Sequence, residues 1–158
     1  MSLTLKDDLN FTQDGRHIST LIIPHSTNSS DWGSLLLPVI VVRNGTGPTV
    51  LFTGGNHGDV YEGPIALIKL ANELKAEDIQ GKVIIVPNLN FLAVLTRTRL
   101  FPIDGQNMNR SFPENPDGSM TQKIADFVYS ELVMRSDAVL DFHFGGNSMI
   151  FEPCTVLH

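Results

Sequence analysis

Two histidines in the sequence have the surroundings of metal-binding or catalytic groups. His57 lies in Gly54-Gly-Asn-His-Gly-Asp59, directly after a short apolar run, and His143 lies in Asp141-Phe-His-Phe-Gly-Gly146, after another. Nearby glycines permit tight turns where strands end. Neutral imidazoles, completed by a carboxylate and a water, form the usual shell of catalytic zinc. Either histidine alone can be a hydrogen-bonded turn residue, but the two together favour a shared site.

A third motif, Asp104-Gly-Gln-Asn-Met-Asn-Arg-Ser-Phe-Pro113, lies in a long polar connection over about residues 97–118. A connection of this length without regular structure is usually functional. Arg110 beside Asn109 can bind a carboxylate through paired hydrogen bonds, although a solvated polar loop is the alternative. For Asp104 we prefer a structural role in an Asp-Gly turn.

The first elements that must position these motifs are two strands, predicted over residues 18–24 and 35–43. Both are rich in β-branched and other apolar residues, and the Ser/Asn/Gly-rich segment 26–34 separates them. This pattern predicts an antiparallel pair. We therefore expect residues 1–48 to form an N-terminal β segment packed on a main domain, residues 49–158.

The main domain alternates strands with helices. The sequence predicts three further strands, over residues 49–53, 82–87 and 138–142, and a helix over residues 63–75 with Pro64 in its first turn. Ser119-Met-Thr-Gln122 resembles a capping box before a second helix. This order predicts an α/β fold with a mixed, mainly parallel sheet flanked by helices. Residues 149–158 are also strand-like, so the predicted sheet is incomplete.

Composition narrows the classes of function. The chain has 158 residues and a net charge of −6, which argues against charge-driven contact with nucleic acid. It has no apolar run of about 18 residues and no signal-peptide pattern, so we expect no membrane association. A single cysteine fits a reducing compartment, and we expect a cytoplasmic protein. An unfinished sheet exposes a strand edge, which predicts a homo-oligomer.

Together, the three motifs resemble the succinylglutamate desuccinylase/aspartoacylase family of the zinc carboxypeptidase superfamily, over about residues 50–158. The residues of these motifs are most similar to those of the branch that deacetylates N-acetyl-diaminobutyrate. The resemblance implies a zinc-carboxypeptidase-like fold and hydrolysis of an amide bond in a small N-acyl amino acid. It implies one zinc ion held by His57 and His143, and a substrate carboxylate held by Asn109 and Arg110. Arg97 or Arg99 is implied as an additional substrate-binding residue.

The sequence departs from the family pattern at the third metal ligand. The family's His-x-x-Glu motif places a glutamate where this chain has Val60, which cannot bind a metal. Glu62 is a tentative substitute, although its charge also suits a helix N-terminus, and Asp59 is a weaker one. Asn107 stands where some members have an aspartate that orients a zinc-bound histidine.

Chain length is the second departure. Family members are about twice as long, and their general base lies in the part that has no counterpart here, so no catalytic residue is assigned. The resemblance therefore implies a zinc-dependent deacylase that binds its metal weakly and has little activity. The alternative is a non-catalytic module that binds an N-acyl amino acid or another carboxylate.

Overall fold

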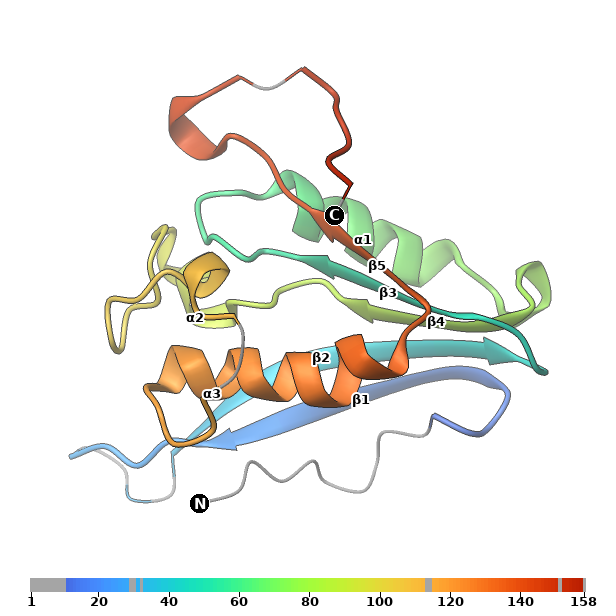
Figure 1. Cartoon of the computed structure of the whole chain (residues 1–158), viewed down its shortest axis with the longest axis horizontal. Helices are drawn as coiled ribbons and strands as arrows, with labels where there is room; N and C mark the ends of the chain where they lie inside the picture. The colour runs from blue at the N-terminus through green and yellow to red at the C-terminus, as the bar shows by residue number, and fades with distance from the viewer. Residues whose placement is uncertain (1–10, 29–30, 32, 113–114, 151, 158) are drawn as a thin grey trace.

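The structure is a computed structural model that describes residues 11–28, 31, 33–112, 115–150 and 152–157. Within these residues, five strands form one sheet in the order β1-β2-β4-β3-β5, with helices on both faces (Figure 1). The predicted mixed α/β architecture is confirmed. The strands are β1 (Gly15–Pro24), β2 (Ser34–Asn44), β3 (Thr49–Gly54), β4 (Gly81–Val86) and β5 (Ala138–Phe142).

The N-terminal strands continue the same sheet as the rest of the chain. β1 and β2 pair antiparallel, as predicted, with Ile18 opposite Ile40. β2 then pairs antiparallel with β4, where Ile40 lies opposite Ile85. Backbone hydrogen bonds therefore join the N-terminal β segment to the main domain, while a domain boundary at residue 48 stays a prediction.

The parallel part of the sheet brings the two histidine motifs to one edge. β3 runs parallel to both β4 and β5, and Gly54, the last residue of β3, is in register with Phe142, the last residue of β5. Parallel strands end on the same side of a sheet, which is where open α/β sheets bind ligands. The loops that carry His57 and His143 therefore start next to each other.

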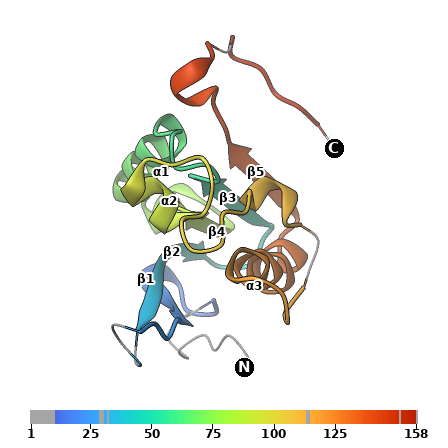
Figure 2. The ribbon, with the colours of Figure 1, turned by 90° about the vertical axis from the view of Figure 1, so that its left-hand side faces the viewer.

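The helices lie on opposite faces of the sheet (Figure 2). α1 (Glu62–Glu73) covers one face, and α3 (Met120–Phe127) covers the other with the π-helical turn Val128–Leu132 that continues it. α2 (Phe91–Thr96) follows β4. The predicted capping box is present, because Ser119 and Gln122 each accept a hydrogen bond from the other's backbone N–H.

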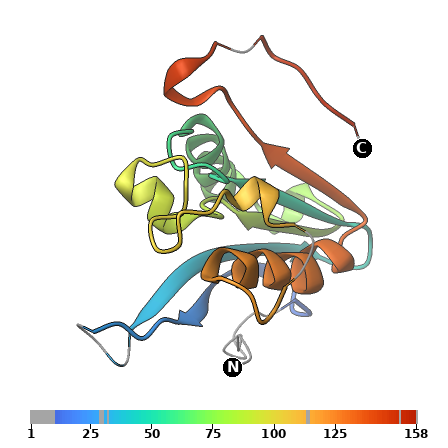
Figure 3. The same ribbon diagram turned by 60° about the vertical axis from the view of Figure 1, so that its left-hand side comes forward.

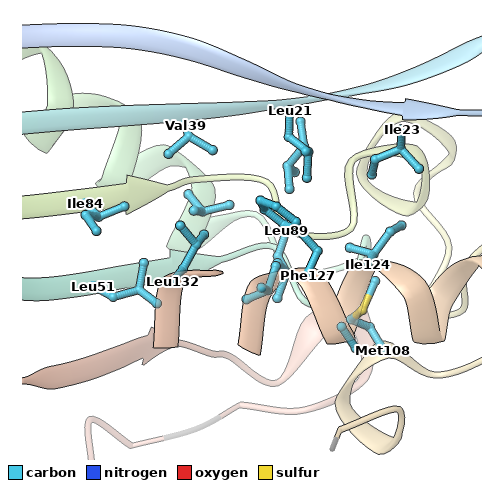
Figure 4. Close-up of a cluster of buried hydrophobic side chains, with 14 of the residues drawn as sticks. Leu21, Ile23, Val39, Leu51, Ile84, Leu89, Met108, Ile124, Phe127 and Leu132 are labelled. Atoms are coloured by element: carbon cyan, nitrogen blue, oxygen red, sulfur yellow. The ribbon is translucent and has the colours of Figure 1, made fainter. Parts of the chain in front are cut away.

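The larger core lies between the sheet and α3 and also fixes the loop with the Asn-Arg motif (Figure 4). Met108 is fully buried in this core, between Asn107 and Asn109. Met108 and Phe101, which is also buried in this core, therefore anchor the long, mainly polar loop. The labelled core residues are Leu21, Ile23, Val39, Leu51, Ile84, Leu89, Met108, Ile124, Phe127 and Leu132.

The prediction of a strand at residues 149–158 was wrong for the part that the structure describes. Residues 149, 150 and 152–157 form no strand, and Ile150 is 99% exposed; residues 151 and 158 lie outside the described ranges. Figure 3 shows this segment leading away from the sheet after β5. A β-rich sequence forms a strand only when a neighbour pairs with its backbone, and none of the described strands does so here.

Candidate functional site

The two histidines meet at the edge where β3 and β5 end. His57 Nδ1 and His143 Nε2 are 2.8 Å apart. The rings are almost perpendicular, at 88°, with centroids 4.7 Å apart. His57 is buried, with 1% of its surface exposed, whereas the side chain of His143 is 34% exposed. The predicted convergence of the two imidazoles is confirmed.

Hydrogen bonds to the outer ring nitrogens determine the tautomer of each imidazole. His57 Nε2 lies 2.9 Å from Asn107 Oδ1, and that oxygen also accepts the backbone N–H of Asn109. His57 Nε2 is therefore the donor. His143 Nδ1 lies 2.9 Å from Asp141 Oδ2, and a carboxylate only accepts, so His143 Nδ1 is also a donor.

Both inner nitrogens, His57 Nδ1 and His143 Nε2, consequently present lone pairs to each other when the rings are neutral. Two facing lone pairs at 2.8 Å repel unless a proton or a metal cation lies between them. Nitrogens that share a tetrahedral zinc lie about 3.4 Å apart, given Zn–N bonds of ~2.1 Å. A small ring rotation would therefore accommodate a metal. Outer nitrogens held by an amide oxygen and a carboxylate are the usual support of metal-binding histidines.

The pKa of His57 lies below the ordinary histidine value. Burial is the largest cause, and the positive charges of Arg99 and His143 lower this pKa further. The hydrogen bond to Asn107 and the charge of Asp59 oppose the shift without cancelling it. The lowered pKa therefore favours the neutral imidazole of His57, which is the form that binds metals.

Backbone hydrogen bonds clamp the loop that carries His57. The backbone N–H groups of Leu89 and Asn90 donate hydrogen bonds to the carbonyl oxygens of Gly54 and Gly55, at 2.8 and 2.9 Å. Gly58 packs so closely on α2 that a Cβ there would lie 1.9 Å from the backbone of Ala93. The glycines of this motif therefore allow the loop to lie between β3 and α2.

The Asn-Arg motif lies beside the histidines. Asn107 contacts His57, and Asn109 Oδ1 accepts a hydrogen bond of 3.3 Å from Asn56 Nδ2. Both asparagines belong to or flank the single 3₁₀ turn Met108–Arg110. Arg110 is exposed and has no ion-pair partner among the described residues. Its guanidinium is therefore available to an anion.

The two earlier arginines differ in their placement. Arg99 is the arginine whose charge acts on His57. Arg97 instead adopts the left-handed conformation, with φ 57°, and ends α2. Sequence reasoning could not separate the two, because neither lies within a regular element whose period would orient its side chain.

The candidates for the third metal ligand do not complete the site. Val60 is buried, with 2% of its surface exposed, one turn after His57, whose carbonyl oxygen accepts its N–H. Glu62 is exposed at the first position of α1. Asp59 has one buried carboxylate oxygen, Oδ1, without a hydrogen bond. The described residues contain no group of three or more His, Cys, Asp or Glu side chains that could hold a metal.

Asp141 is a site residue that sequence reasoning did not single out. Its Oδ2 holds His143, and its Oδ1 accepts a hydrogen bond of 2.7 Å from Thr53 Oγ1 on β3. A usable signal was present, because residues two apart on a strand share a face. Asp141 therefore ties β5 to β3 and orients His143 at the same time.

Asp104 has the structural role that the sequence suggested. Its carboxylate accepts hydrogen bonds from the backbone N–H and the hydroxyl of Thr121, at 2.8 and 2.6 Å, and from the N–H of Gln106, at 3.1 Å. Burial alone would raise the pKa of Asp104, but these hydrogen bonds outweigh it and lower that pKa. The contacts fasten the long loop to the start of α3.

Most of the chain matches one family of known proteins. The family described as succinylglutamate desuccinylase/aspartoacylase catalytic domain matches residues 46–158, and the chain belongs to this family. A curated relative is the N-alpha-acetyl-L-2,4-diaminobutyric acid deacetylase of Halomonas elongata, 51% identical over 95% of this chain and 44% of that protein.

Solved structures agree with this assignment. The product-bound ectoine utilization protein EutE (DoeB) of Ruegeria pomeroyi has a TM-score of 0.83 and 48% identity, over 87% of this chain and 42% of that one. The succinylglutamate desuccinylase/aspartoacylase of Rhodobacter sphaeroides has a TM-score of 0.85 and 45% identity, over 88% of this chain and 43% of that one. The predicted zinc-carboxypeptidase-like fold is confirmed. The chain spans less than half the length of these relatives.

The described residues contain no helix long and apolar enough to span a membrane.

Proposed function

We propose that this chain carries the metal-binding and carboxylate-binding part of a zinc-dependent deacylase that acts on small N-acyl amino acids. The single observation that supports this most strongly is the pair of facing imidazole nitrogens, His57 Nδ1 and His143 Nε2. Both outer nitrogens are already donors, so the inner pair is a site for a cation. The relative from Halomonas elongata, a deacetylase of an N-acetylated amino acid, supports the reaction class.

Two of the three protein ligands expected of a catalytic zinc fit this chain. His57 and His143 would hold the ion, which when bound supplies Lewis-acid polarisation of an amide carbonyl and a water of lowered pKa. Val60 does not fit as the third ligand, because its side chain has no donor atom. We therefore propose weak zinc binding, with Glu62 able to contribute only if the start of α1 rearranges.

The polar residues beside the histidines would hold the substrate. Arg110 and Asn109 would bind its carboxylate, since a guanidinium and an amide N–H₂ are both donors. Arg99 takes the additional role in preference to Arg97, because its charge reaches His57. Such contacts align an amide with the histidine pair, so that binding energy is used for orientation.

One observation favours a second candidate function, a non-catalytic module that binds N-acyl amino acids. Val60 fills the ligand position as a well-buried apolar side chain, as a residue selected for packing would. In this case the carboxylate-binding loop would function without hydrolysis. The two candidates differ in whether His57 or Arg110 is essential.

Metal analysis together with ligand titration separates the candidates. Zinc binding to the purified chain is measured by equilibrium dialysis, and binding of N-acetyl-L-2,4-diaminobutyrate is measured by calorimetry. The deacylase proposal expects bound zinc that the His57→Ala variant loses. The binding-module proposal expects no zinc, and ligand binding that the Arg110→Ala variant loses. Absence of both zinc and ligand binding contradicts both proposals.

A further inference from the structure

We propose that Asn56 is a positioning residue for the substrate carboxylate and that it acts through Asn109. The proposal rests on the proposed function, because it needs an anionic group to be held beside Arg110. Asn56 precedes His57 in the loop after β3, and only 5% of its surface is exposed. It therefore cannot contact a ligand by itself, whereas Asn109 is exposed.

The hydrogen bond between the two amides determines which group Asn109 presents. Asn56 Nδ2 donates to Asn109 Oδ1 at 3.3 Å. This contact occupies the carbonyl oxygen of Asn109 and leaves its N–H₂ group, which only donates. A carboxylate needs donors, so this orientation suits it. The reversed amide would present a carbonyl oxygen, which repels a carboxylate.

The backbone of Asn56 is held in place by the buried side chain of Asn90. Its backbone carbonyl oxygen accepts a hydrogen bond of 3.2 Å from Asn90 Nδ2. Asn90 is fully buried, caps α2 by accepting the N–H of Ala93, and donates its own N–H to Gly55. Because the backbone of Asn56 is held in place, its side-chain amide can in turn hold the side chain of Asn109 in one orientation.

The same two loop segments make a second, parallel contact. Asn56 pairs with Asn109, and the next residue, His57, pairs with Asn107. One contact fixes the tautomer of a metal-binding imidazole and the other fixes the amide of a substrate-binding asparagine. Loss of the Asn56 contact should therefore disturb the carboxylate while leaving the histidine pair in place.

Packing does not explain Asn56. Its Oδ1 is buried and has no hydrogen-bond partner among the described residues. A buried, unpaired carbonyl oxygen lowers stability, and a smaller or apolar side chain would avoid that loss. A local conflict of this kind is expected at functional sites rather than in ordinary core positions. The contact with Asn109 supplies the functional explanation.

A double-mutant cycle tests the proposal. The variants Asn56→Ala, Asn109→Ala and their double are titrated with N-acetyl-L-2,4-diaminobutyrate and with its carboxamide derivative, which lacks the negative charge. We expect Asn56→Ala to weaken the carboxylate ligand by about tenfold, to leave the carboxamide unaffected, and to add nothing when Asn109 is already alanine. Equal losses for both ligands, or additive losses in the double variant, overturn the proposal.

Two further variants make every outcome decisive. Arg110→Ala reports on the carboxylate site itself. If wild type fails to bind the ligand, or Arg110→Ala has no effect, the proposed function fails; if only Asn56→Ala has no effect, this inference alone fails. Should Asn56→Ala not fold, Asn56→Asp replaces it. A carboxylate at this position only accepts, turns the Asn109 amide around, and should weaken the carboxylate ligand more than the carboxamide. Part of this loss should disappear when Asn109 is already alanine, whereas a loss of the same size in both backgrounds would reflect charge repulsion alone and would overturn the proposal.

Discussion

The centre of the sheet and its β5 edge have similar sequences but different surroundings. β3 and β5 are neighbouring, parallel and apolar. Yet Leu51 on β3 is completely buried, whereas its partner on β5, Val139, is 44% exposed. Apolar composition therefore decides that both segments become strands, while burial depends on which elements cover them. At β5, the described part of the chain supplies a neighbour on one side only.

The candidate site spans this boundary. His57 comes from the covered side, in a loop clamped by backbone hydrogen bonds, and His143 comes from the open side. Asp141 is the link, since it holds His143 and accepts a hydrogen bond from Thr53 on β3. His57 is thus held in a buried loop, whereas His143 is held by a few polar contacts.

The largest expected effect comes from truncating one leucine on each of the two strands. Leu51→Ala removes a fully buried side chain and should lower the free energy of unfolding by about 2–5 kcal/mol. Leu140→Ala removes a side chain that is 44% exposed and should cost less than about 1 kcal/mol. Urea unfolding followed by circular dichroism measures both. Equal losses of stability in the two variants would contradict the difference in burial between β3 and β5. Repeating the experiment at several protein concentrations shows whether self-association covers β5.

A smaller effect is expected when the missing metal ligand is restored. Val60→Glu places a carboxylate one turn after His57, and zinc affinity should rise by more than about 100-fold, because a direct ligand should exceed the 10–100-fold effect of an outer-shell group. Without zinc, the buried charge should make the variant less stable than wild type. Calorimetric titration with zinc and thermal unfolding with and without the metal test both expectations.

The control for this experiment is Val60→Gln, because glutamine has nearly the same size as glutamate but carries no charge. It should share part of the loss of stability and gain little zinc affinity. No gain in affinity for Val60→Glu over Val60→Gln would mean that residue 60 does not face the histidine pair. The interpretation of the third ligand position would then be wrong.

The contacts behind the two histidines provide the next test of the comparison. Asp141→Asn retains a hydrogen-bond acceptor for His143 but loses the charge, and zinc affinity should fall by about 10–100-fold. Asn107→Asp adds a charge behind His57 and should raise the affinity for the same reason. Zinc titration against a competing chelator measures both changes. Equal falls in both variants would show that fold disruption, rather than charge, controls binding.

Sequence reasoning succeeded where the chain carries local signals. The strand runs and the Ser119–Gln122 capping box follow from patterns within a few residues, and the placement of His57 and His143 after strand-like runs predicted that they would meet. Sequence reasoning failed where the structure of a segment depends on which other segments pack against it. Residues 149–158 have a strand-like composition, but the described ones, 149, 150 and 152–157, form no strand. The choice between Arg97 and Arg99 depends on how a loop folds back on His57.

The smallest expected effect is a pH dependence of stability that arises from His57. Burial lowers the pKa of His57 below its unfolded value near 6.5, so between the two values the unfolded chain binds more protons than the folded one. Stability from this residue is complete above pH 6.5 and is lost as the pH falls through the folded pKa. Metal-free unfolding measured from pH 7.5 to pH 5 should show this slope in wild type and a shallower one in His57→Gln. Identical slopes would place the titrating group elsewhere, and a proton NMR titration of the imidazole of His57 then reports its pKa directly.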